Sequence, residues 1–209
     1  MTSSQTPRGA CPTLDSPMAV ADGLLARFRP QAGLRSNQLS ALADAAEANG
    51  NGLIEITARG NLQVRGLKQS SAEAFRNALA ESGIFAQPAP AIEISPLAGD
   101  DPKAITDPRP LARAIRAVCN EALERDILSP KLSIVLVTGG QILLDGLKAD
   151  IRLIARPDGW ALELGSDTIG ELDQSEVPAA VGIILSALQS EGPRSRASDL
   201  SAPQIAAQI

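Results

Sequence analysis

The stretch "IEITARGNLQVRGL", residues 54 to 67, contains two short segments in which apolar and polar side chains alternate. Successive side chains of a β-strand point to opposite faces, so the alternation predicts two strands, and the "ARGN" between them predicts a tight turn. The polar residues of this hairpin are Glu55, Thr57, Gln63 and Arg65, with Arg59 and Asn61 near the turn. The apolar residues Ile54, Ile56, Leu62 and Val64 share the opposite face, which we expect to pack against helices.

The polar face of this hairpin has two interpretations. In the first it is a solvated surface, because antiparallel sheets commonly pack one face and expose the other. In the second it is an anion site, where Arg59 and Arg65 converge on ligand carboxylates through charge-assisted hydrogen bonds. Arg27 or Arg29 of the neighbouring strand would join them there. Strand parity alone is consistent with both interpretations.

The sequence on either side of the hairpin predicts a ferredoxin-like unit. The segment "GLLARFR", residues 23 to 29, alternates as a strand does, and a helix is expected from Ser36 to the glycines at 50 and 52. A second helix is expected after the hairpin, with Ser70 and Glu73 as a capping box, and "AIEIS", residues 91 to 95, predicts a last strand. The resulting order β-α-β-β-α-β is that of a split βαβ unit over residues 20 to 96.

Residues 97 to 191 predict a second unit, of the α/β type. A turn-rich segment leads to a helix that begins near Pro108, and the apolar run "LSIVLV", residues 132 to 137, predicts a central strand. Two further segments, "ADIRLIA" and "WALELG", flank an "RPDG" turn and predict a hairpin, and a last helix is expected from Ser175. The predicted fold class is therefore α+β, and residues 1 to 19 and 192 to 209 are expected to be flexible.

The composition excludes several functions. The chain of 209 residues contains no histidine, which removes imidazole bases, histidine ligands of haem and most zinc sites. Its formal net charge of -5 provides no basic field for nucleic acid or for an acidic membrane surface, so an anion site has to be a local cluster. The sequence shows neither a signal-peptide pattern nor an apolar run long enough to span a membrane. A cytoplasmic location is therefore expected, with no nucleic-acid or membrane partner.

Four motifs of the sequence occur in the order that is found in a known superfamily. They are "RGACPTLDSPMAVADGLLARFRP", "GNGLIEITARGNLQVRGL", "SPLAGDDP" and "LSPKLSIVLVTGG". In this order they resemble the sirohaem-dependent nitrite and sulfite reductases and, among them, the precorrin-3B synthases of cobalamin biosynthesis. The resemblance extends from about Arg8 to about Leu200. It implies a ferredoxin-like unit followed by an α/β unit of the haem-binding type, together forming the amino-terminal half of a protein that repeats both.

The resemblance also implies a ligand for the polar face, namely sirohaem or a related tetrapyrrole such as a precorrin. Such a ligand carries many carboxylates, and nearby arginines attract them even where the net charge of the chain is negative. The residues that the resemblance assigns to these carboxylates are Arg27, Arg29, Arg59, Asn61, Gln63, Arg65 and Lys131. For Lys131 the pattern is equally consistent with a solvated residue at the start of a strand.

Several positions depart from the family pattern. The cysteines that hold the [4Fe–4S] cluster of the family belong to the second repeat, so this chain is not expected to ligate that cluster. Cys11 and Cys119 are not at those positions, and Cys119, beside the apolar stripe of its helix, is interpreted as a core residue. The segment "PAI", residues 90 to 92, replaces an "RNV" motif of the reductases, and Ser133 replaces their second active-site lysine. Both replacements argue against reduction of sulfite or nitrite, because small anions need such cations.

The hypothesis that combines these features is an amino-terminal half of a precorrin-3B synthase-like oxidoreductase, for which no catalytic residue and no metal ligand is assigned. The parent reaction would be O2-dependent hydroxylation and lactone formation on precorrin-3A, and the half is expected to be inactive alone. The alternatives are a non-catalytic tetrapyrrole-binding or interaction module, a nitrite/sulfite reductase-like half, and a ferredoxin-like domain that binds nothing. We expect the isolated half to form a homodimer or to bind a separate chain that carries the cluster half.

Overall fold

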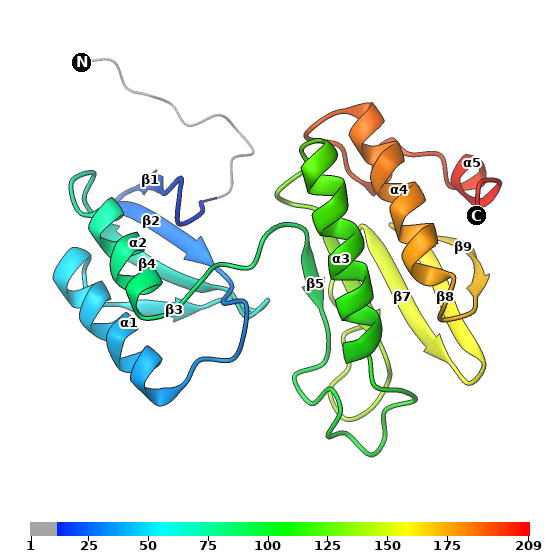
Figure 1. Ribbon diagram of the computed structural model, residues 1–209, viewed down its shortest axis with the longest axis horizontal. Coiled ribbons are helices and arrows are strands. Elements are labelled where there is room, and N and C mark those ends of the chain that lie inside the picture. Colours follow the sequence, from blue (N-terminus) through cyan, green and yellow to red (C-terminus); the bar gives the residue numbers. More distant parts are fainter. Residues whose placement is uncertain (1–11) are drawn as a thin grey trace. The chain divides into compact units, whose positions relative to one another are not determined.

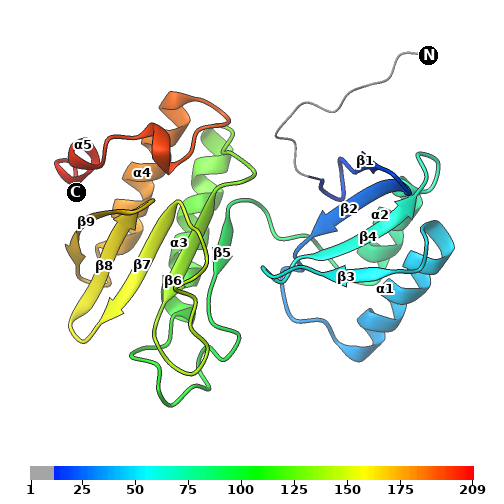
Figure 2. The same ribbon diagram turned by 180° about the vertical axis from the view of Figure 1, so that it is seen from behind.

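The computed structural model describes residues 12 to 209 and divides the chain into two compact units (Figures 1 and 2). The first unit ends at Pro88, and the second extends from Ala89 to Ile209. Each unit has its own sheet, its own pair of long helices and its own buried apolar cluster.

The first unit is a four-stranded antiparallel sheet with two helices on one face (Figures 1 and 2). The strands lie in the order β1-β2-β4-β3. Their bounds are β1 (Met18–Val20), β2 (Gly23–Phe28), β3 (Ile54–Ile56) and β4 (Leu62–Leu67). The helices are α1 (Ser36–Asn49) and α2 (Ala72–Glu81). The predicted hairpin of residues 54 to 67 is thus confirmed as β3 and β4, which pair in an antiparallel register.

The core of the first unit lies between this sheet and its helices. Ala26 and Val64 are register partners on β2 and β4, and both are completely buried against residues such as Phe75 of α2. Strand parity therefore predicted the apolar face correctly, with one exception. Ile56 is 75% exposed, because it is the last residue of an edge strand that has a neighbour on one side only.

The helix ends of the first unit differ in detail from the prediction. Ser36 is the first residue of α1, but the expected capping box of Ser70 and Glu73 does not form. Ser71 instead precedes α2, where its hydroxyl accepts the Lys68 N–H at 3.0 Å and donates to the Asn49 carbonyl at 2.6 Å. The start of α2 is therefore tied to the end of α1.

The second unit is a five-stranded mixed sheet whose strands lie in the order of the sequence, β5-β6-β7-β8-β9. Their bounds are β5 (Ala91–Glu93), β6 (Ser133–Val137), β7 (Ile151–Arg156), β8 (Gly159–Leu164) and β9 (Asp167–Leu172). The pairs β5–β6 and β6–β7 are parallel, and the pairs β7–β8 and β8–β9 are antiparallel. Helices α3 (Arg109–Arg125) and α4 (Val177–Glu191) cover one face (Figure 1). The predicted interior strand β6 and the β7–β8 hairpin are confirmed, whereas β9 was not predicted.

The strand expected to complete the ferredoxin-like unit lies in the other sheet. β5 pairs with β6 in parallel, with Ile92 beside Ile134, and Ile92 is buried in the core of the second unit. The units therefore divide between Pro88 and Ala89 and not after residue 96. The pattern of "AIEIS" shows that the segment is a strand, but only the apolar surface of β6 determines which sheet it joins.

Both terminal segments contain more structure than was expected. Part of the segment 1 to 19, expected to be flexible, forms β1, and Leu14 is buried against the first core; residues 1 to 11 lie outside the described part of the chain. The segment 192 to 209 contains a short 3-10 helix, η1 (Ala197–Asp199), and α5 (Ala202–Ala206). Ala197 and Ile205 are buried in the second core. The prediction of a flexible tail is therefore wrong, because sparse anchor residues hold this segment without a regular apolar period.

Candidate anion-binding site

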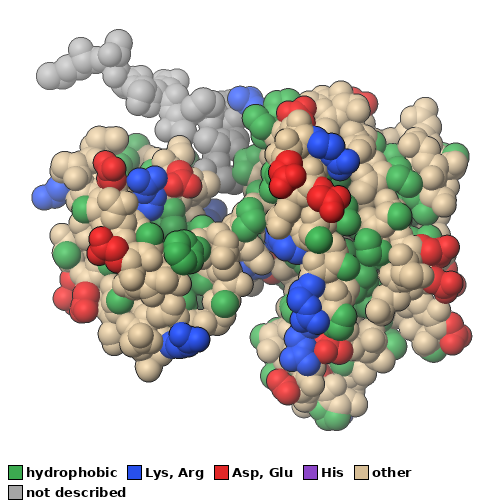
Figure 3. Space-filling model, in the orientation of Figure 1, with side chains coloured by type: hydrophobic (Ala, Val, Ile, Leu, Met, Phe, Trp, Pro, Cys, Tyr) green, Lys and Arg blue, Asp and Glu red, His purple; other side chains and the backbone are tan. Residues whose placement is uncertain are grey.

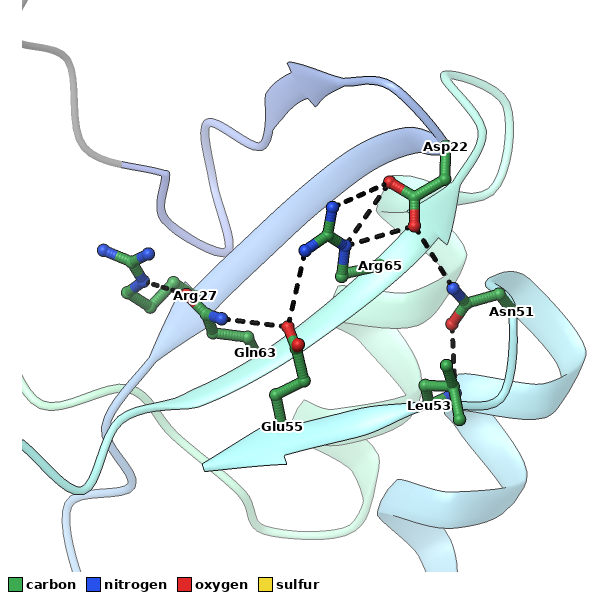
Figure 4. A network of polar contacts seen from close by, with 7 residues as sticks. All are labelled: Asp22, Arg27, Asn51, Leu53, Glu55, Gln63 and Arg65. Atoms are coloured by element: carbon green, nitrogen blue, oxygen red, sulfur yellow. Dashed lines mark hydrogen bonds and ion pairs between the residues drawn. The ribbon is translucent and has the colours of Figure 1, made fainter. Parts of the chain in front are cut away.

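The sheet face of the first unit that faces away from its helices carries an ordered array of polar side chains. Arg27 of β2 and Glu55 of β3 are both register partners of Gln63 on β4, so the three side chains form a row across three strands. Arg65 lies two residues further along β4 and therefore points to the same face. Figure 4 shows these side chains lying side by side above the strands. On the helix side of this unit, by contrast, charged side chains of both signs are scattered (Figure 3).

Gln63 fixes the centre of this row. Its amide oxygen accepts a hydrogen bond from Nε of Arg27 at 2.5 Å, and its amide nitrogen donates to Oε2 of Glu55 at 3.0 Å. The residue is only 9% exposed, and both ends of its amide are used, so it has one preferred orientation. Among the described residues Arg27 makes its hydrogen bond through Nε alone, and in Figure 4 its terminal nitrogens point away from the other side chains drawn.

Arg65 lies between two carboxylates. Its Nε contacts Oδ2 of Asp22 at 3.1 Å and its NH2 contacts Oδ1 at 3.2 Å, which is a two-point ion pair. Its NH1 lies 3.7 Å from Oε2 of Glu55, a distance typical of an ion pair without a hydrogen bond. Hydrogen bonding from Arg65 lowers the pKa of Asp22, and the same bond raises the pKa of Arg65. Asn51 adds a weaker donor to Asp22 at 3.4 Å.

The turn between β3 and β4 is stabilised by side chains that the sequence suggested as ligand contacts. Thr57 Oγ1 accepts both the backbone N–H of Asn61, at 3.1 Å, and its side-chain amide, at 3.3 Å. Gly60 has a φ of 70°, a conformation that favours glycine. A terminal nitrogen of Arg29 donates to the carbonyl of Arg59. Asn61 and Arg29 thus hold the shape of the turn that presents the Arg59 side chain.

The structure brings six of the seven predicted site residues together on this face and its turn. They are Arg27, Arg29, Arg59, Asn61, Gln63 and Arg65. Four arginines against the carboxylates of Asp22 and Glu55 leave a local surplus of positive charge. Asp22 is the member of this array that sequence reasoning missed, because it lies in the β1–β2 turn and β1 was not predicted.

The seventh residue, Lys131, lies in the second unit. It is exposed and lies two residues before β6. Ser133, at the start of β6, is 4% exposed, and both its N–H, at 3.0 Å, and its hydroxyl, at 3.3 Å, bind Oδ2 of Asp150. The same carboxylate binds Arg196 through two nitrogens, at 2.8 and 2.9 Å, and accepts the N–H of Ala197. Ser133 therefore belongs to a buried structural cluster.

The side chains that could bind a metal ion include the two cysteines, of which only Cys119 is among the described residues. Cys119 is completely buried in the second core, as predicted, and this burial raises the pKa of its thiol to about 11. Cys11 lies outside the described residues. Within residues 12 to 209, no group of three or more His, Cys, Asp or Glu side chains could hold a metal ion. The two cysteines of the sequence are too few for the four thiolates of a [4Fe–4S] cluster.

Across residues 12 to 209, no helix is both long enough and apolar enough to cross a bilayer.

Three similarities to known proteins agree with this architecture. Residues 17–82 match the family described as "Nitrite/Sulfite reductase ferredoxin-like half domain". A precorrin-3B synthase from a Sinorhizobium species is 43% identical over 210 residues, which cover 96% of this chain and 46% of that protein. The chain therefore spans about half the length of this curated relative.

The structure of the Mycobacterium tuberculosis NirA protein is similar in fold. Its TM-score is 0.60 at 19% sequence identity, and the match covers 83% of this chain and 36% of that one. The predicted α+β class, with a ferredoxin-like half domain followed by an α/β unit, is confirmed. Residues 17–82 thus form a nitrite/sulfite reductase ferredoxin-like half domain, and the chain as a whole is similar to precorrin-3B synthase.

Proposed function

We propose that this chain is the tetrapyrrole-binding part of a precorrin-3B synthase-like protein of cobalamin biosynthesis, corresponding to its amino-terminal half. The observation that carries the proposal is the arginine array on the polar sheet face, ordered around the buried amide of Gln63. The similarity to a precorrin-3B synthase over nearly the whole chain supports the same function.

The residues of the array fit a ligand that carries many carboxylates. Arg27, Arg59 and Arg65 would contact carboxylates, because a guanidinium matches a carboxylate through two parallel hydrogen bonds. Arg29 and Asn61 would act by holding the β3–β4 turn. Lys131 lies in the second unit, and its assignment rests on the family resemblance alone. A local positive charge of this kind attracts anions although the chain as a whole carries a net charge of -5.

The redox chemistry of the proposed reaction belongs to a metal centre. O2-dependent hydroxylation and lactone formation on precorrin-3A need such a centre, while protein side chains bind and orient the substrate. The tetrapyrrole held here would be this substrate or a sirohaem cofactor. A [4Fe–4S] cluster does not fit the cysteines of the chain, and Cys119 is buried in the core. Turnover would therefore require a cluster-bearing half, supplied by the remainder of a longer protein or by a separate chain.

Two alternatives follow from particular observations. Reduction of nitrite or sulfite is disfavoured, because the family's lysine position is Ser133, which is buried and bound to Asp150. A non-catalytic tetrapyrrole-binding module in the cytoplasm is the other alternative, and it would use the same arginine array. A second copy of this chain or a cluster-bearing chain is the partner we propose.

The test is a binding titration of the purified chain with sirohaem or precorrin-3A, followed by visible absorption. We expect saturable binding by the unmodified chain and clearly weaker binding by Arg59→Ala. Arg76→Ala is the matched control, because Arg76 is an exposed arginine on α2, in the helical layer of the same unit, and should bind as the unmodified chain does. Absence of saturable binding would reject the proposed function, and unchanged binding by Arg59→Ala would reject the role of Arg59.

A further inference from the structure

The two carboxylates inside the arginine array have a role that binding alone does not require. We infer that Glu55 determines specificity: its carboxylate holds the place at Arg65 NH1 that a ligand carboxylate takes, while Arg27 offers a second place, so that the site selects molecules with at least two carboxylates. This inference rests on the proposed function and names the residue that sets its selectivity.

The hydrogen bonds of Arg65 show which of its nitrogens is available. Nε and NH2 donate to Asp22 at 3.1 and 3.2 Å, but NH1 makes no hydrogen bond to any described residue. The nearest carboxylate oxygen to NH1 is Oε2 of Glu55, at 3.7 Å, and that oxygen already accepts the Gln63 amide at 3.0 Å. Glu55 thus compensates the charge of Arg65 without saturating its donors.

Arg27 provides a similar donor on the other side of Gln63. Within the described residues its only hydrogen bond runs from Nε to Gln63, so its two terminal nitrogens can donate to a ligand. Arg27 is the register partner of Gln63, and Arg65 is two residues further along β4, where the register between β2 and β4 shifts. Diagonal neighbours in a regular antiparallel pair have Cβ atoms roughly 7–8 Å apart, a spacing that two carboxylates on one tetrapyrrole can bridge.

Asp22 and Glu55 differ in how firmly they are held. Asp22 makes a two-point ion pair with Arg65 and orients its guanidinium. The Glu55 side chain is 45% exposed and contacts Arg65 at one longer distance, so it can move away into solvent. A ligand with one carboxylate gains little by replacing Glu55, since it exchanges one ion pair for another. A ligand bound simultaneously at Arg27 has a high effective concentration at Arg65 and displaces Glu55.

The experiment compares Glu55→Gln with the unmodified chain in fluorescence titrations with uroporphyrin, a porphyrin with eight carboxylates. The substitution keeps an oxygen that can accept from Gln63 and removes only the charge. We expect uroporphyrin to bind about two- to fivefold more tightly to Glu55→Gln, the size typical of one exposed ion pair. Asp22→Asn should give no such gain, because it loosens Arg65. Glu81→Gln, which removes a charge from an exposed residue of α2, should leave the affinity unchanged.

The outcomes separate this inference from the proposed function. If the unmodified chain binds uroporphyrin and Glu55→Gln binds equally or less tightly, the inference is rejected and the proposed function stands. The inference is also rejected if Asp22→Asn or Glu81→Gln gains as much as Glu55→Gln, because net charge then explains the effect. Binding by Glu55→Gln alone supports the inference and rejects the function for the unmodified chain. If neither the unmodified chain nor Glu55→Gln binds uroporphyrin, both the inference and the proposed function are rejected. Circular dichroism checks the fold, and Glu55→Ala replaces Glu55→Gln if that variant unfolds.

Discussion

The two units of this chain use the same ion-pair chemistry in opposite environments. In the first unit Arg65 and Asp22 are about one-third and two-fifths exposed, at 33% and 41%, and their array retains hydrogen-bond donors that no described residue accepts. In the second unit the side chain of Asp150 is 4% exposed, and donors from Ser133, Arg196 and Ala197 surround it. The buried carboxylate of Asp150 is fully occupied by structural contacts, and the exposed array is the part for which we propose a ligand.

This difference agrees with the energetics of charged groups. A buried carboxylate must have all of its acceptor capacity used, because an unpaired charge in a low-dielectric interior is costly. An exposed ion pair contributes little to stability, since water solvates each partner when the pair separates. The exposed ion pairs can therefore separate at little cost, while the contacts around Asp150 cannot.

The largest expected effect is on the buried cluster. Asp150→Ala should lower the free energy of unfolding by about 2–4 kcal/mol, because it leaves the Ser133 N–H buried without an acceptor and frees Arg196 and its segment. The measurement is urea unfolding followed by circular dichroism. Asp145→Ala, at an exposed position in the same unit, is the control and should change stability by less than about 0.5 kcal/mol. Equal stabilities of the two variants would contradict a structural role for Asp150.

A smaller effect is expected on the exposed array, and it should appear in binding. Arg27→Ala should weaken tetrapyrrole binding about tenfold, because a charge-assisted contact to a carboxylate is lost. Its free energy of unfolding should change by less than about 0.5 kcal/mol, since the side chain is partly exposed. The absorbance titration and the urea unfolding experiment measure the two quantities separately. If Arg27→Ala loses much stability but no affinity, Arg27 has a structural role and the contrast with the cluster around Asp150 is wrong.

The smallest expected effect is on the melting temperature at acid pH. The pKa of Asp22 is lowered by Arg65 from an ordinary value of 3.8, so its contribution to stability is complete above that value and is lost as the pH falls through the lower pKa of the folded state. The melting temperatures of the unmodified chain and Asp22→Asn should therefore differ at pH 7 and approach one another below about pH 4. Asp44→Asn, on the exposed face of α1, should show no such convergence. A constant difference across this range would argue against the ion pair.

Much of the fold was predictable from local patterns. Alternation identified β2, β3, β4, β7 and β8, the apolar run identified β6, and helices α1 to α4 began within two residues of the expected positions. These predictions succeed because side-chain periodicity depends on residues a few positions apart. The candidate site was predictable for the same reason, since strand parity placed Gln63 and Arg65 on the polar face.

The sequence by itself determined most of the strands and the four long helices, the polar face of the hairpin and the resemblance to the family. Only the tertiary structure decided that β5 joins the second sheet, that Asp22 holds Arg65, and that Arg196 anchors the last segment on Asp150. The residues of the last two pairs lie 43 and 46 positions apart in the chain. Such contacts depend on which surfaces are buried together, and no local pattern contains that information.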